Sequence, residues 1–344
     1  MTTHVHFVGS IGLDTVEEVF DTVGRELAPR LKRCPDGEVG GRRLWITWQW
    51  PLLRSSPYLQ VDEQALIPGL GLCPLRLGAG ARAEDVAFGE LGYAREARAS
   101  YQDFLAARAR GQIAPTTRFQ VSLPTPFAVV HAFVVPEDAP RVLPAYEAAM
   151  LRELARLATA IPQADLAIQW DVCMEMLVWD GRTAYLPKIP DMAGVFGATF
   201  ARLCGAVAPA AQLGFHLCYG DLDAEHAVQP VDLSRAVGLA NLLLASSPHR
   251  VDWIHMPVPK ARDDAAYYAP LRDFAGHGTT ELYLGLVHAA DGADGTLRRM
   301  RAAAPYAPGF GIATECGIAR ARRPQRVRET LHVHAEAARQ FDDG

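Results

Sequence analysis

Eight short apolar runs, rich in residues that favour β-strands, recur along the chain, and segments with helical spacing separate most of them. Helical spacing is clearest at 16–27, 143–160 and 232–245. Eight parallel strands that alternate with helices predict an α/β fold of the (β/α)8 TIM barrel type. The expected strands span residues 5–8, 31–34, 118–123, 166–170, 213–218, 251–256, 281–287 and 310–314.

The chain is longer than such a barrel requires. A (β/α)8 barrel needs about 250 residues, whereas this chain has 344. The surplus falls between the second and third expected strands, at 39–117, where Trp45, Trp48 and Trp50 precede a glycine-rich stretch at 69–80. We expect a long insertion that covers the barrel mouth, so that residues 1–344 form a single catalytic domain.

Charge and hydropathy exclude two classes of partner. The formal net charge is −5, which leaves no basic footprint for nucleic acid and no polybasic patch for a membrane surface. No apolar run reaches the length of about 18 residues that a membrane span needs, and the first residues lack the features of a secretory signal. We therefore expect a cytoplasmic protein without nucleic-acid or membrane partners.

Polar side chains follow the expected strands at their carboxyl ends, where enzymes of this barrel class place their active sites. Polar groups are costly on buried strands unless they are used, so this arrangement indicates a functional site. In strand order the candidate residues are Ser10, Glu38, Thr125, Asp171, His216 with Cys218, His255, His288 and Cys316.

Three of these residues form a candidate donor set for one metal ion. His216 and Cys218 are two positions apart on one expected strand, so both side chains point to the same face. Cys316 joins them from the eighth strand, and one imidazole with two thiolates is a donor set that zinc prefers. The six cysteines form no C-x-x-C pair, and in a cytoplasmic chain they are expected as buried thiols or ligands rather than disulfides. The sequence therefore predicts a bound Zn²⁺.

Two other histidine pairs need a separate interpretation. His4 and His6 resemble the H-x-H of amidohydrolase barrels, but in those enzymes the pair follows the first strand, and here it begins that strand. His332 and His334 lie on an expected C-terminal helix at 325–341. Residues two apart on a helix face different ways, so we expect both of these histidines on the solvated surface.

The strand-end motifs resemble those of cobalamin-independent methionine synthase, in its C-terminal catalytic barrel, among the uroporphyrinogen-decarboxylase-like barrels. The segments His216-Leu-Cys218-Tyr and Thr314-Glu-Cys316-Gly are similar to that family's two zinc motifs. The family's remaining zinc ligand is a glutamate that ends the sixth strand, and His255 takes that place here. The resemblance therefore implies zinc ligation by His216, Cys218, His255 and Cys316.

The same resemblance implies substrate roles. Phe7-Val-Gly-Ser10 is similar to the segment whose serine holds an amino-acid carboxylate. Asp36-Gly-Glu38 and Ile168-Gln-Trp-Asp171 are similar to segments whose carboxylates meet the substrate ammonium. Leu123-Pro-Thr125-Pro is similar to a Thr-Gly-Pro loop of the family's site, and His288 falls where the family carries a catalytic histidine.

These features predict a zinc-dependent methyl- or alkyltransferase, methionine-synthase-like, that activates a thiol. Zinc lowers the pKa of a thiol, and His288 would serve as general acid for the leaving group. The expected partners are a small-molecule thiol or amino-acid-like substrate and a methyl donor that the sequence does not name. Two alternatives stay open: a zinc-dependent hydrolase on the same barrel, and a non-catalytic ligand-binding relative. The alternatives to His255 as fourth ligand are Asp221, Glu225 or water.

Overall fold

The computed structural model describes residues 2–183, 186–220, 226–319 and 324–344. The strands are β1 (Arg33–Pro35), β2 (Leu59–Val61), β3 (Leu75–Leu77), β4 (Arg118–Pro124), β5 (Leu166–Val172), β6 (Gln212–Leu217), β7 (Trp253–Pro257), β8 (Glu281–Val287) and β9 (Gly311–Thr314). The α-helices are α1 (Val16–Leu27), α2 (Trp50–Arg54), α3 (Tyr93–Ala109), α4 (Pro126–Phe133), α5 (Ala139–Ala160), α6 (Met174–Asp180), α7 (Met192–Gly205), α8 (Ser234–Ser246), α9 (Ala265–Tyr268), α10 (Gly292–Ala303) and α11 (Pro324–Asp343). Short 3-10 helices are η1 (Ala28–Arg30), η2 (Gly40–Leu44), η3 (Thr47–Gln49), η4 (Ala83–Asp85) and η5 (Ala269–Asp273).

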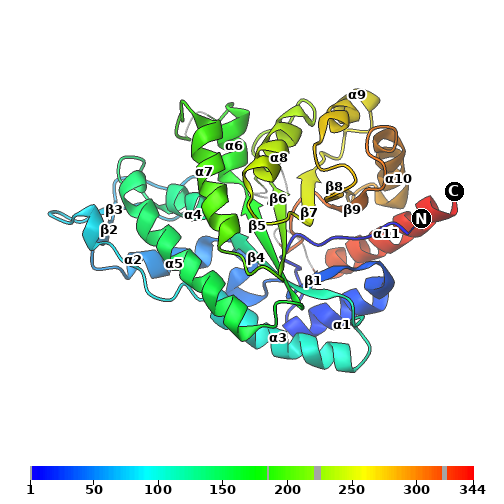
Figure 1. Ribbon diagram of the computed structural model, residues 1–344, viewed down its shortest axis with the longest axis horizontal. Coiled ribbons are helices and arrows are strands. Elements are labelled where there is room, and N and C mark those ends of the chain that lie inside the picture. The colour runs from blue at the N-terminus through cyan, green and yellow to red at the C-terminus, as the bar shows by residue number, and fades with distance from the viewer. Residues whose placement is uncertain (1, 184–185, 221–225, 320–323) are drawn as a thin grey trace.

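A parallel sheet of seven strands forms the centre of the molecule. Its strand order is β1-β4-β5-β6-β7-β8-β9, and a separate antiparallel pair joins β2 to β3. Figure 1 shows this sheet curled, with helices around its outside. The α/β class with a mostly parallel sheet is confirmed, and seven of the eight expected strands are present close to their predicted bounds.

The first expected strand, 5–8, is not a regular strand. Val5 makes only isolated parallel bridges, to Leu31 on one side and to Ile312 on the other. The carbonyl oxygen of Val8 accepts hydrogen bonds from inward-facing side chains, among them Gln120 at 3.2 Å, so it is not available to a neighbouring strand. The segment lies between the two edges of the sheet, and an eight-stranded closed barrel stays a prediction.

The helix α1 shows how local sequence sets an element. The Thr15 side chain accepts a hydrogen bond from the Glu18 amide and caps the helix start. The helix buries Val19, Phe20, Val23 and Leu27 on one face, which is the spacing of an amphipathic helix. That face packs against α3 and α11, and the ring of Phe20 meets that of Phe119 of β4 edge to face.

The C-terminal helix corrects one prediction. His332 is exposed, as expected, but His334 is fully buried. Its Nδ1 donates to the Thr330 carbonyl at 2.8 Å, and its ring lies 5.4 Å from that of Phe7. The helix α11 packs against both α1 and α10, so the face turned to these neighbours extends to position 334.

The predicted insertion, 39–117, contains η2, η3, α2, β2, β3, η4 and α3. The antiparallel pair β2–β3 projects at the far left of Figure 1, and the amide of Leu77 donates to the Asp138 carboxylate, 2.9 Å away, at the start of α5. Helix α3 packs against α1, α5 and β4, so this part belongs to the layer of helices around the sheet. The role of the rest as a cover over the strand ends stays a prediction.

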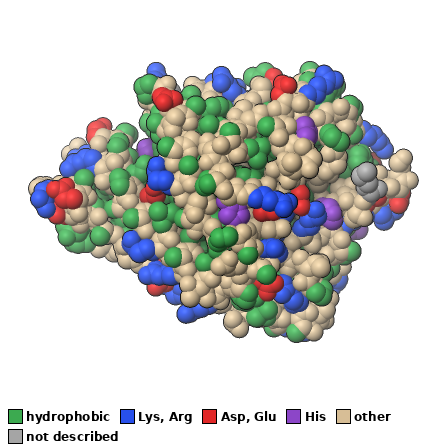
Figure 2. Space-filling model, in the orientation of Figure 1, with side chains coloured by type: hydrophobic (Ala, Val, Ile, Leu, Met, Phe, Trp, Pro, Cys, Tyr) green, Lys and Arg blue, Asp and Glu red, His purple; other side chains and the backbone are tan. Residues whose placement is uncertain are grey.

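The helices and the surface charges can be compared with the expectations about membrane and nucleic-acid partners. In the part of the chain that the structure describes, no helix is both long and apolar enough to cross a membrane. Acidic and basic side chains are interspersed over the face shown in Figure 2. The view shows no single continuous basic area on that face.

Candidate metal centre

One row of paired residues crosses the sheet and brings the candidate residues to one edge. In the parallel register Pro124 pairs with Asp171, and Asp171 pairs with His216. His216 in turn pairs with His255 on β7. Because paired residues on neighbouring parallel strands lie at the same height, the strand ends that follow this row meet at one place.

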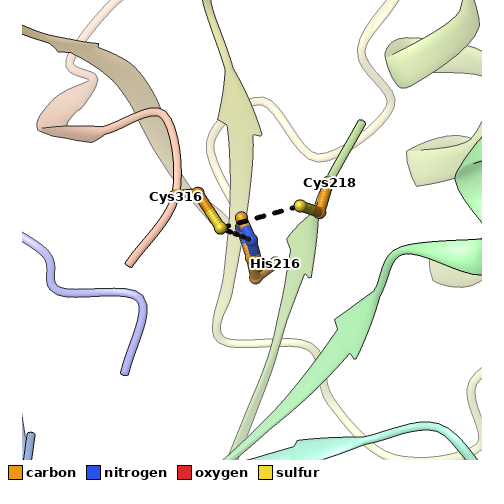
Figure 3. Close-up of side chains that lie close together, drawn as sticks. All are labelled: His216, Cys218 and Cys316. Atoms are coloured by element: carbon orange, nitrogen blue, oxygen red, sulfur yellow. Dashed lines mark hydrogen bonds between the residues drawn. The ribbon is translucent and has the colours of Figure 1, made fainter. Parts of the chain in front are cut away.

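His216, Cys218 and Cys316 form a compact, buried cluster. Their possible ligand atoms all lie within 4.8 Å of one another. The sulfur of Cys316 is 3.7 Å from the sulfur of Cys218 and 3.6 Å from Nε2 of His216. Figure 3 shows the three side chains pointing toward one another, with both cysteines just beyond the strands that carry them. The structure therefore brings together the three residues that the sequence grouped.

These distances fit a tetrahedral zinc ion. Bond lengths of about 2.3 Å to sulfur and about 2.0–2.1 Å to nitrogen, at tetrahedral angles, place two sulfur ligands about 3.8 Å apart and a nitrogen about 3.6 Å from a sulfur. The two distances from the Cys316 sulfur, 3.7 Å to the Cys218 sulfur and 3.6 Å to Nε2 of His216, agree with these values, and all three donor atoms lie within 4.8 Å of one another. The donor types and these two distances are thus compatible with a zinc ion held by His216, Cys218 and Cys316.

Hydrogen bonds fix the backbone at each cysteine. The amide of Cys218 donates to the Val172 carbonyl at 3.1 Å, which continues the β5–β6 pairing past the end of β6. After β9, the Thr314 hydroxyl donates to the Cys316 carbonyl at 2.6 Å and tightens the turn. Both cysteines therefore lie at hydrogen-bonded backbone positions next to a strand end.

His255, expected as a fourth ligand, lies behind His216. Its Nδ1 is 2.7 Å from Nδ1 of His216, and its Nε2 is 3.0 Å from the Thr314 carbonyl oxygen. Complete burial lowers the pKa of His255 to about 3. One ring nitrogen thus faces Nδ1 of His216 and the other faces a backbone carbonyl, so His255 lies next to the group of donor atoms and not within it. The other expected ligands, Asp221 and Glu225, lie outside the described residues.

His288 is paired with a carboxylate at the strand ends. Its Nε2 donates to the Val258 carbonyl at 2.9 Å, and its Nδ1 lies 3.3 Å from Oε2 of Glu315. Burial lowers the pKa of His288, and the Glu315 carboxylate opposes that shift. Since a carbonyl only accepts, Nδ1 is the nitrogen through which His288 can exchange a proton. Glu315 occupies the acidic position before Cys316 in the sequence motif, but its link to His288 needed the structure.

The expected substrate residues Ser10 and Glu38 pack against glycines. A Cβ atom on Gly9 would lie 2.6 Å from the Glu38 carboxylate, and one on Gly317 would lie 2.1 Å from the Ser10 hydroxyl. Each glycine therefore makes room for a polar side chain beside it. Glu38 also has a positive φ of 48°, an uncommon conformation for a residue with a side chain, and its amide donates to Asp36.

Asp171 is oriented by a buried polar network that sequence reasoning missed. The Gln169 amide nitrogen donates to Asp171 at 2.9 Å, and its oxygen is 2.9 Å from Nε2 of His6. Strand alternation carried the signal, because Gln169 and Asp171 are two apart and share a face. His4 instead contacts the Arg30 carbonyl. The two histidines of the H-x-H pair thus have separate partners, and neither belongs to the metal cluster.

Thr125 and Glu175 lie together beyond β4 and β5. Thr125 is fully buried, and its hydroxyl oxygen accepts from the Ala128 amide and caps α4. Glu175 is 1% exposed, and neither of its carboxyl oxygens has a hydrogen-bond partner among the described residues. Burial raises the pKa of Glu175 to about 7, although the Thr125 hydroxyl lies near enough to oppose the shift. A buried carboxyl without a fixed partner was not expected from the sequence.

Comparisons with known proteins give matches in structure alone. No family model matches the chain, and no curated protein matches it in sequence. A B12-independent methionine synthase from Shewanella sp. W3-18-1, solved with selenomethionine, superposes with a TM-score of 0.66 at 12% identity, over 100% of this chain and 98% of that one. A putative vitamin-B12-independent methionine synthase from Listeria monocytogenes gives 0.60 at 11% identity, over 99% of each chain. The chain therefore has the fold of the cobalamin-independent methionine synthases along its whole length.

Proposed function

We propose that the chain is a zinc-dependent methyl- or alkyltransferase that acts on a thiol, with chemistry like that of methionine synthase. The observation that carries this proposal is the close grouping of the His216, Cys218 and Cys316 donor atoms, in which the two distances from the Cys316 sulfur fit zinc ligation. Three protein donors converge among the described residues, and catalytic zinc sites use three protein ligands and keep a fourth position for water or substrate. Bound there, zinc would lower the pKa of a substrate thiol and hold it as a thiolate.

The surrounding residues suit an amino-acid-like thiol. Glu38 and Asp171 would bind its ammonium group, and Ser10 would contact its carboxylate. The selenomethionine in the Shewanella structure supports this type of ligand. Gln169 would hold Asp171 in its orientation through their 2.9 Å hydrogen bond. Substrate recognition would thus rest on charged groups positioned by the strand ends.

His288 would act as the general acid that protonates the leaving group of the methyl donor. Its Nε2 is held by the Val258 carbonyl, and its Nδ1 faces Glu315. A proton on Nδ1 would be available to a leaving group, and Glu315 would stabilise the protonated ring. The methyl donor is an unnamed small molecule in this proposal.

Metal analysis and thiol binding test the proposal. The purified protein should contain about one zinc per chain, and Cys218→Ser and Cys316→Ser should lose most of it. Cys73→Ser is the matched control, because Cys73 lies in the predicted insertion and outside the cluster. In the cobalt-substituted protein, homocysteine should add a sulfur-to-cobalt charge-transfer band. A thiol without the amino-acid groups, such as 1-propanethiol, should produce the same band only at a higher concentration than homocysteine.

The outcomes separate the alternatives. A wild-type protein that takes up no metal, and that tolerates both serine substitutions, would support a non-catalytic relative. A hydrolase would be supported by two results together: no thiol changes the spectrum of the cobalt-loaded protein, and the protein hydrolyses substrates in water without a thiol acceptor. Either result would overturn the transferase proposal.

A further inference from the structure

We propose that His255 is a positioning residue that holds His216 in the tautomer needed for metal binding, before any metal arrives. In this tautomer the proton is on Nδ1 of His216, and the lone pair of Nε2 faces the two thiols. The inference deepens the proposed metal site, and it makes His255 a partner of a ligand instead of a ligand.

The Thr314 carbonyl fixes which ring nitrogen of His255 donates a hydrogen bond. Its carbonyl oxygen lies 3.0 Å from Nε2 of His255. A carbonyl oxygen can only accept, so Nε2 of His255 must carry the proton. The opposite assignment would set a nitrogen lone pair against the oxygen lone pairs at hydrogen-bond distance.

The second step passes from His255 to His216. His255 is completely buried, and burial in apolar surroundings favours the neutral ring. A neutral ring with its proton on Nε2 has a bare Nδ1, which accepts. Nδ1 of His216 is 2.7 Å away, so His216 must donate from its own Nδ1.

The last step reaches the cluster. With its proton on Nδ1, His216 has a lone pair on Nε2, and this atom is 3.6 Å from the Cys316 sulfur. The other tautomer would direct an N–H at the place where the donor atoms converge and could not bind a metal there. Partners that fix the tautomer of a metal-bound histidine are typically worth 10–100-fold in metal affinity.

The fold supports this contact independently of a metal. His216 and His255 are paired in the β6–β7 register, and their ring centroids are 4.8 Å apart. At the other end of the same strands, the Asp252 carboxylate accepts from the Leu213 amide at 3.0 Å. The two imidazoles are therefore held side by side by backbone pairing.

A pair of similarly shaped variants tests the role. His255→Asn keeps an acceptor near the place of Nδ1, whereas His255→Leu has nearly the same shape without one. We expect His255→Leu to weaken zinc binding 10–100-fold in a chelator competition, and His255→Asn to stay within a few-fold of wild type. Met256→Leu, a nearly volume-conserving change on the same strand, controls for altered packing of β7.

Nitrogen NMR of the metal-free wild-type protein supplies a readout that does not depend on any variant folding. Long-range nitrogen–proton correlations distinguish the two tautomers, and the signals of His216 are identified by their loss in His216→Gln. We expect wild type and His255→Asn to show the proton on Nδ1 of His216, and His255→Leu to shift it toward Nε2.

Two results would overturn the inference. The first is a wild-type His216 with its proton on Nε2. The second is equal loss of zinc affinity in His255→Asn and His255→Leu, which is the pattern expected if His255 binds the metal itself. Failure of wild type to take up zinc would overturn the proposed function alone, because the tautomer is measured without metal.

Discussion

The sulfur atoms of Cys218 and Cys316 lie 3.7 Å apart, although 98 positions separate the two residues in the sequence. Parallel strands carry both thiols to the same edge of the sheet, one after β6 and one after β9. Two thiols in contact are suited to sharing a metal, and they are also suited to oxidation when no metal is present.

We therefore predict that oxidation of the metal-free protein joins Cys218 to Cys316. A mild oxidant such as diamide would take up the two hydrogen atoms lost by the thiols as the disulfide forms. Peptide mass spectrometry should detect the linked pair in metal-free protein and much less of it after zinc loading. Cys204, buried in α7, should stay reduced in both. Equal crosslinking with and without zinc would show that the thiols do not bind the metal.

We predict that the position of the Glu38 carboxylate requires a residue without a side chain at Gly9. In Gly9→Ala the new Cβ would lie 2.6 Å from the Glu38 carboxylate, so the carboxylate must move. We expect a loss of up to about 2–5 kcal/mol in the binding of L-methionine, measured by calorimetry, because a charged partner is displaced. Thermal stability should change little, because the far end of a flexible side chain can move aside. Gly41→Ala is the matched control, because a Cβ there meets nothing within 4 Å. An equal loss of L-methionine affinity in both variants would show that Glu38 does not bind the ligand.

Asp171 is predicted to recognise the ammonium group of the ligand. Asp171→Asn still offers an oxygen to Gln169 but loses the negative charge, which should cost about 2–5 kcal/mol of binding. The loss should appear with L-methionine and be absent with 4-(methylthio)butanoate, its analogue without the amino group. Asp180→Asn, which changes a buried carboxylate paired with Arg182, should leave both affinities unchanged. A similar loss for both ligands would contradict the assignment.

We predict that burial of Glu175 lowers the free energy of unfolding as pH rises. Its pKa is about 7 in the folded protein against an ordinary value of 4.5, so between these values the folded state holds a proton that the unfolded state has released. This contribution is fully present below pH 4.5 and is lost as pH rises through 7. The difference is worth roughly 3 kcal/mol. Glu175→Gln should therefore match wild type near pH 5 and be more stable at pH 8.

Urea unfolding at the two pH values measures this effect. Glu153→Gln provides the contrast, because the Glu153 carboxylate accepts from the amides of Leu91 and Ala94. That variant puts an amide N–H₂ where an acceptor is needed, so it should lose stability at pH 8. A Glu175→Gln protein with the same pH dependence as wild type would show that Glu175 is already ionised near neutral pH.

The sequence alone determined the class of fold and three of the four residues that it offered as metal ligands, which the structure brings together as His216, Cys218 and Cys316. Apolar runs and helical spacings are local patterns, so seven strands and the helices α1, α5, α8 and α11 could be predicted from them. The period of two along a strand places His216 and Cys218 on one face, and it needs no knowledge of the rest of the chain. The strand-end positions then indicated that Cys316 would join them.

The tertiary structure decided what depends on contacts between distant segments. His255 lies at the end of the expected strand, but only the Thr314 carbonyl and the neighbouring His216 ring decide which atoms its two ring nitrogens meet. The burial of His334 and Glu175 likewise follows from how helices pack on the sheet. Hydrogen-bond direction and burial are properties of the assembled neighbours, whereas strand and helix periodicity are properties of the chain itself.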